Sequence, residues 1–147
     1  MADNTGPLPD ISTELERRMT ISEKQAERAY RVLAEMGLSL ESLPLVLAQD
    51  GEVIAFAGPI SEAHASRLAR HADRAWREGA ARLPPELIRF QEEMIDDTPE
   101  RAAYLIYSAH IAGAVTLTVG WQPPISFTRV RAEVTAARAD LMQILSG

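Results

Sequence analysis

Residues 44–58 read PLVLAQDGEVIAFAG, in which two short apolar runs flank an Asp-Gly pair and the second run ends at a glycine. Asp50-Gly51 predicts a type I′ turn, because both central residues of that turn need a positive φ and this pair adopts it at low cost. The two-residue loop sets the strand register: Gln49 opposite Glu52, Leu47 opposite Ile54, and Leu45 opposite Phe56. Both faces of the hairpin are largely apolar, so we expect helical layers on both sides of it, in the middle of a sheet.

The composition indicates one globular domain. The chain has 147 residues, 46% hydrophobic and 24% charged, which suits a single core. It has no cysteine, which excludes disulfides and thiolate zinc sites and is consistent with a reducing cytoplasm. The net charge of −6 argues against a general nucleic-acid binder. No apolar run reaches the roughly 20 residues that cross a bilayer, so we expect a cytoplasmic protein without membrane insertion.

The chain divides into an N-terminal extension, residues 1–20, and one domain, residues 21–147. Glycine and prolines near the start and few apolar residues predict that the extension is partly disordered. A short helix near its end, capped by Ser12 or Thr13, is also consistent with the sequence. The first main helix is expected over about 22–36, with a capping box formed by Thr20 and Glu23 and with Gly37 as its stop.

Two more helices and three more strands follow from spacing and turn residues. One helix runs from a Ser61 cap to about Ala80, and the last follows a Ser126 cap with an apolar stripe in steps of three and four. Turns at 97–100 and 112–113 separate three expected strands, at about 86–95, 103–111 and 114–121. The resulting class is α+β.

No catalytic or cofactor site is predicted. His64 and His71 are seven residues apart on one helix, about 10 Å, too far to share a metal, and each histidine, His110 included, is interpreted as structural. The acidic pairs at 92–93 and 96–97 point to opposite faces of a strand, so neither forms a general acid/base dyad. Phosphate-binding glycine loops and nucleophile motifs are absent from the sequence.

Charge is unevenly distributed along the chain. An arginine row, Arg67, Arg70, Arg74 and Arg77, lies on the outer side of the second main helix, and an acidic stretch follows it at 86–100. Solvated surface is the plainer interpretation of each charge, and steering of a partner protein is the alternative.

The order of elements and several strings resemble the Roadblock/dynein light chain family over about residues 20–146. These strings are LAQDGEVIAFAG at 47–58, the small-residue helix SEAHASRLARHADRAW after it, and the closing ISFTRVRAEVTAARADLMQIL. The resemblance implies a five-stranded antiparallel sheet in the order 2-1-5-4-3. The first and last main helices would lie on one face of the sheet and the middle helix on the other.

The resemblance also implies a homodimer in which the third strands of two copies pair at their edges, through Arg89, Phe90, Gln91, Glu92 and Glu93. If the twofold axis passes at Gln91, Arg89 of one copy faces Glu93 of the other. Relatives in this family serve small Ras-like GTPases, as in a bacterial polarity system, or act as scaffolds, and supply no catalytic residue. We therefore expect a bacterial, non-enzymatic adaptor that forms a homodimer through these strand residues. It would bind a small Ras-like GTPase through the arginine row on the dimer surface. The alternatives are a ligand-sensing PAS- or GAF-like module and a scaffold without a GTPase partner.

Overall fold

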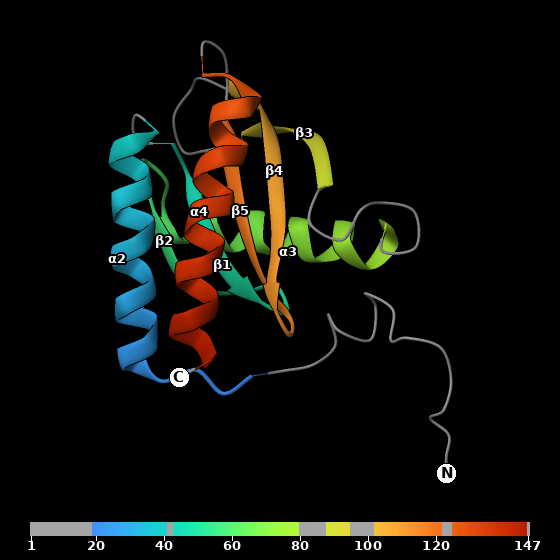
Figure 1. Cartoon of the computed structure of the whole chain (residues 1–147). Coiled ribbons are helices and arrows are strands. Elements are labelled where there is room, and N and C mark those ends of the chain that lie inside the picture. Colours follow the sequence, from blue (N-terminus) through green and yellow to red (C-terminus); the bar gives the residue numbers. More distant parts are fainter. Residues whose placement is uncertain (1–18, 41–42, 80–87, 95–101, 122–124, 147) are drawn as a thin grey trace, which may run out of the picture.

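A computed structural model describes residues 19–40, 43–79, 88–94, 102–121 and 125–146, with backbone alone for 79, 88–94 and 102–105. These residues form three helices and one antiparallel sheet (Figure 1). In chain order the elements are α2 (Glu23–Ser39), β1 (Leu45–Gln49), β2 (Glu52–Ala57), α3 (Glu62–Gly79), β3 (Ile88–Met94), β4 (Ala102–Ala112), β5 (Val115–Trp121) and α4 (Phe127–Ser146). The α+β class and the antiparallel sheet agree with the sequence-based expectation.

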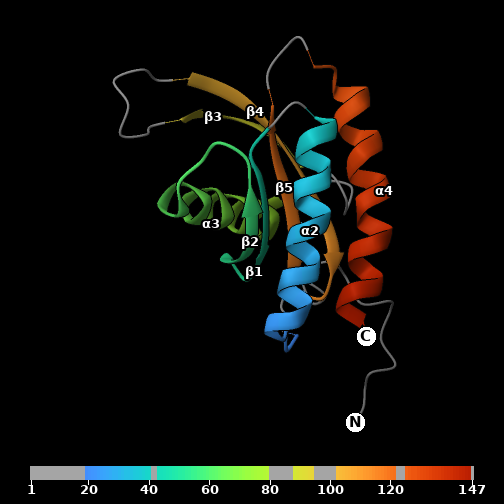
Figure 2. The same cartoon turned by 90° about the vertical axis from the view of Figure 1, so that its left-hand side faces the viewer.

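The sheet separates two helical layers. Its strand order is β2-β1-β5-β4-β3, and the pairs β1–β2, β1–β5, β4–β5 and β3–β4 are all antiparallel. α2 and α4 lie side by side on one face and α3 crosses the other (Figures 1 and 2). The opening hairpin is therefore not central, because β1 lies inside the sheet while β2 forms one of its edges.

The hairpin turn has the expected conformation, but the strands leave it with a different register. Asp50 has φ 52° and Gly51 has φ 79°, as a type I′ turn requires. Gln49 pairs with Glu52 as predicted, whereas Leu47 pairs with Ala55 and not with Ile54. A β-bulge after the first pairs shifts the remaining register by one residue, so Leu45 pairs with Ala57. The predicted register was wrong beyond the turn, because a bulge leaves no clear mark on an apolar sequence.

The start and the end of α2 both differ from the expected positions. Ser22, not Thr20, is the N-cap: its side chain accepts from the backbone N–H of Gln25, whose own side chain accepts from the Ser22 backbone. Gly37 does not stop the helix, which continues to Ser39 and ends at Leu40. Gly37 is buried inside the helix, next to Leu45, so a glycine in the helix interior had the appearance of a helix stop.

α3 presents mostly small residues to the sheet. Ser61 caps the helix by accepting from the backbone N–H of His64 at 3.1 Å. The buried stripe on its inner side comprises Ala65, Leu68, Ala69, Ala72 and Trp76. The first three of these pack on Val46, Ala48 and Ile106. Burying these side chains stabilises the layer through the hydrophobic effect.

The larger core lies between the sheet and the α2–α4 layer. Ser126 caps α4 through the backbone N–H of Arg129, as expected. The predicted apolar stripe of α4 is buried, comprising Val130, Val134, Ala137, Leu141 and Ile144. All of these except Ile144 join Leu33 and Met36 of α2 against Leu47 and Leu117 of the sheet. Packed side chains therefore cover both faces of β1 and β5.

Candidate functional site

The arginine row occupies the side of α3 that faces away from the sheet. Arg67, Arg70, Arg74 and Arg77 recur in steps of three and four, so they share one side of the helix, and all four are exposed. The buried alanine stripe fixes the rotation of α3 and thereby holds this side outward. The predicted partner-binding residues thus lie together on one surface.

Arg77 differs from the rest of the row because it forms ion pairs within the protein. Its guanidinium lies 3.0 Å from a carboxylate oxygen of Asp73 and 3.0 Å from one of Asp50 in the hairpin turn. Gly51 of the same turn touches α3, since a Cβ on it would lie 3.4 Å from the Cβ of Asp73. Arg77 therefore joins the β1–β2 turn to α3. Sequence reasoning grouped Arg77 with the row and missed Asp50, because only the fold brings this turn to α3.

The other arginines border a shallow hollow at the junction of the turn and the helix. It has a volume of about 600 Å³ and is lined by Asp50, Gly51, Arg67, Arg70, His71, Asp73 and Arg74. Arg70 and Arg74 form no ion pair with any residue that the structure describes. Guanidinium groups are planar donors that bind carboxylates with two parallel hydrogen bonds. This surface is suited to an acidic segment of another protein.

The expected dimer strand, β3, lies at the sheet edge opposite β2. Among the described strands it pairs with β4 alone, with Arg89 opposite Tyr107, Gln91 opposite Leu105 and Glu93 opposite Ala103. The outer edge of this strand therefore has backbone groups available to another strand. The structure describes only the backbone of residues 88–94, so the interface residues Arg89, Phe90, Gln91, Glu92 and Glu93 are placed by register alone.

The histidines do not gather with other ligand types. His64 and His110 are buried, and the imidazole Nε2 of His110 lies 2.6 Å from the carbonyl oxygen of Gly113. Across the described ranges, no group of three or more His, Asp or Glu residues could hold a metal ion. Residues 96–97 lie outside the described part. Of the helices described, none is long and apolar enough to span a membrane.

Comparison of sequences finds no matching family model and no matching curated protein. Comparison of structures does find similar proteins. Myxococcus xanthus MglB superposes with a TM-score of 0.66 at 18% identity, over 87% of this chain and 95% of that one. The gliding protein MglB of Thermus thermophilus gives 0.62 at 17% identity, over 89% and 98%. A structure described as MglB with tetrameric arrangement gives 0.63 at 17% identity, over 89% and 97%.

These neighbours establish the fold. They cover nearly the whole of each chain, so the likeness extends over the complete arrangement of sheet and helices. The Roadblock-type fold that the sequence indicated is the fold that this chain shares with the bacterial MglB structures.

Proposed function

We propose that this protein is a non-enzymatic, homodimeric regulator of a small Ras-like GTPase, which it binds through the arginine row of α3. The observation that carries the proposal is the outward row itself, with Arg70 and Arg74 exposed beside a shallow hollow on an MglB-like fold. The Roadblock family that the sequence resembles supplies regulators of such GTPases. Shared fold and resemblance support this class of function, and the arginines suggest where the partner docks.

Dimerisation through β3 would double this surface. Pairing of two β3 edges would extend the sheet from one copy to the other and bring the two α3 helices side by side. The paired arginine rows would then form one basic platform. A GTPase whose switch loops are held on this platform in one of their two conformations would hydrolyse or exchange nucleotide at a changed rate. Regulation would therefore follow from a difference in affinity for the two states.

A GTP turnover assay tests the proposal. We expect turnover or nucleotide exchange by a small Ras-like GTPase of the same organism to change when this protein is added. Arg70→Glu/Arg74→Glu should weaken binding by at least about tenfold, because two like charges replace two complementary ones. Arg28→Glu/Arg31→Glu is the matched control, since these two exposed arginines lie on α2, on the other face of the sheet.

The outcomes separate a regulator from a scaffold. Binding that prefers one nucleotide state and changes turnover supports regulation. Equal binding to both states without an effect on turnover would support the scaffold alternative. Absence of binding to every small GTPase of the organism would overturn the GTPase proposal. The PAS- or GAF-like alternative would need a ligand to co-purify with the protein, which a native mass spectrum detects.

A further inference from the structure

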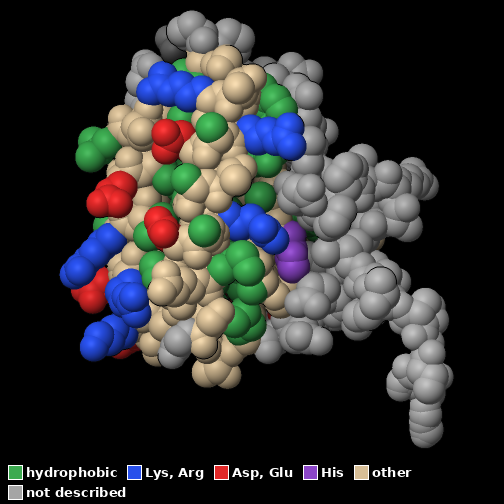
Figure 3. Space-filling model, in the orientation of Figure 1, with side chains coloured by type: hydrophobic (Ala, Val, Ile, Leu, Met, Phe, Trp, Pro, Cys, Tyr) green, Lys and Arg blue, Asp and Glu red, His purple; other side chains and the backbone are tan. Residues whose placement is uncertain are grey.

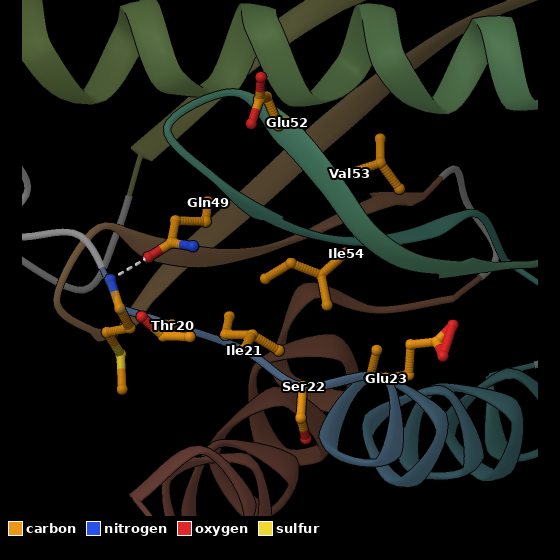
Figure 4. A pocket seen from close by; sticks show the side chains of 10 residues that line it. Thr20, Ile21, Ser22, Glu23, Gln49, Glu52, Val53 and Ile54 are labelled. Carbon is orange, nitrogen blue, oxygen red and sulfur yellow. Dashed lines mark hydrogen bonds between the residues drawn. The ribbon is translucent and has the colours of Figure 1, made fainter.

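A groove runs between α2 and the outer edge of β2, and none of the arginines of α3 lines it. Two hollows of about 630 and 640 Å³ share Glu23, Ala26, Val53 and Ile54 as lining residues, so they are continuous. The first lies against Met19–Glu23 at the start of α2 (Figure 4), and the second continues to Gly58 and Glu62. α2 and the β2 edge face the viewer in Figure 2. The groove therefore follows the whole strand.

The groove exposes the backbone edge of β2. Every residue from Glu52 to Gly58 lines one hollow or the other. Because successive side chains of a strand point to opposite faces, a hollow bordered by consecutive residues runs along the strand edge. β2 pairs only with β1 among the described strands, so its outward N–H and C=O groups border the groove. Such an edge can accept one more strand.

The α2 wall of the groove is acidic and carries an exposed aromatic ring. Glu23, Ala26, Glu27 and Tyr30 recur at helical spacing and line this wall. Tyr30 is 49% exposed, one of the few large apolar side chains at the described surface. Elsewhere the α2–α4 face carries basic and acidic side chains interspersed (Figure 3). The lining of the groove holds four glutamates, Glu23, Glu27, Glu52 and Glu62, and no lysine or arginine.

We propose that this groove binds an extended, basic peptide segment of a partner protein, which adds as a strand to β2. Charge selects the occupant: alternate lysine or arginine side chains of the added strand would face the α2 wall, beside Glu23, Glu27 and Tyr30. The apolar side chains between them would point to the opposite face of the sheet, beside Val53 and Phe56. The protein's own N-terminal segment is a poorer match. Residues 1–18 contain four acidic residues, Asp3, Asp10, Glu14 and Glu16, against the two arginines Arg17 and Arg18.

The test uses the full chain and three labelled hexapeptides. The probe alternates lysine and valine; one control replaces each lysine by glutamate, and the other carries N-methyl groups on alternate amides. Fluorescence anisotropy should show saturable binding of the basic probe only. N-methylation should weaken it by at least about tenfold, because each lost backbone hydrogen bond reduces affinity several-fold. Amide hydrogen exchange should slow within Glu52–Ala57 when the probe binds.

Substitutions on α2 locate the site. Glu27→Lys should weaken probe binding by about two- to fivefold, as expected when one exposed ion pair is replaced by a like-charge contact. Glu35→Lys is the matched control, because Glu35 is on the same helix but does not line the groove. Tyr30→Ser should also weaken binding. Equal effects of the two charge reversals would mean that the probe senses only the net charge of the protein, which would overturn the proposal.

Other occupants of the groove give distinct results. If the β2 amides that point away from β1 are protected in the free protein at every concentration, a segment of the chain itself occupies the edge. If their protection rises with protein concentration, a second copy occupies it. Either result overturns the proposal, as does equal binding of the acidic or N-methylated peptide.

Discussion

At the scale of single residues, Gly58 is a position where the fold leaves no room for a side chain. Its φ is 99°, and a Cβ on it would lie 2.4 Å from the carbonyl oxygen of Leu43. Both the conformation and the contact oppose any other residue. We expect Gly58→Ala to lower the free energy of unfolding by about 2–3 kcal/mol, measured by equilibrium denaturation in urea.

Gly37 provides the matched control for this glycine substitution. It lies inside α2 with an ordinary helical conformation, and a Cβ on it would meet only Cδ1 of Leu45, at 3.8 Å. Gly37→Ala should therefore raise the free energy of unfolding by about 0.5–1 kcal/mol, because alanine has the higher helix propensity. A similar loss of stability at both positions would contradict this account of the two glycines.

A buried chain of hydrogen bonds connects α3 to the middle of the sheet. The indole N–H of Trp76 donates to Oγ of Ser108 at 2.8 Å, and that hydroxyl lies 3.1 Å from Oγ1 of Thr118. All three residues are buried. Ser108→Ala should lower the free energy of unfolding by about 1–3 kcal/mol, because it leaves the indole N–H without this acceptor in a dry interior.

The variant Thr118→Val tests the Ser108–Thr118 hydrogen bond separately from the Trp76–Ser108 hydrogen bond. It keeps the acceptor of Trp76 and removes only the bond between the two hydroxyls, so its effect should be the smaller one. Tryptophan fluorescence during urea denaturation measures both variants. If Thr118→Val were as damaging as Ser108→Ala, the Trp76 bond would not be the main contribution.

At the scale of elements, the sequence offers two N-cap residues for α2, Thr20 and Ser22, and the structure uses Ser22. Ser22 and Gln25 form the capping box, and the Gln25 amide also donates to the carbonyl oxygen of Ile144 near the end of α4, at 3.1 Å. Ser22→Ala should lower the free energy of unfolding by about 1 kcal/mol, and Thr20→Ala should change it little. Thermal unfolding followed by circular dichroism checks both. A larger loss at Thr20 would restore the cap that the sequence first indicated.

Features set by local sequence were predicted for these elements, whereas features set by tertiary contacts were not. Turn chemistry at Asp50-Gly51 and the caps at Ser61 and Ser126 are local, so they were predicted correctly. The bulge at Ile54 carries no turn or cap signal, so the apolar sequence of β2 did not predict it. The arginine row was visible as a spacing, but the ion pair between Arg77 and the distant Asp50 depends on the fold.

The groove between α2 and β2 could not be predicted from residue spacing, because the topology of the fold creates it. Its walls come from α2 and β2, which are separated along the chain by β1. The acidic residues of α2 look like ordinary solvated surface until the edge of β2 is placed beside them. A sequence pattern therefore identifies the elements but not which pairs of them enclose a site.

At the scale of the whole molecule, the strand order gives the sheet two edges with different surroundings. The β2 edge borders an acidic groove, whereas the β3 edge is the one that the proposed dimer would use. Because the two edges lie at opposite ends of the sheet, pairing at β3 leaves the groove and the outer side of α3 open. One dimer could then hold a GTPase on its platform and a basic segment at each end.

The register of the proposed dimer leads to the last prediction. With a twofold axis at Gln91, Arg89 of each copy faces Glu93 of the other, so each dimer contains two such pairs. Glu93→Arg should weaken dimerisation by roughly tenfold, because two like-charge contacts replace two attractive ones. Adding Arg89→Glu should restore it, and Glu35→Arg should have no effect because Glu35 lies on α2, outside the proposed interface. Analytical ultracentrifugation measures all four proteins. A Glu93→Arg variant that dimerises like the unaltered protein would exclude this register, and an unaltered protein that stays monomeric would exclude the platform on which the proposed GTPase regulation depends.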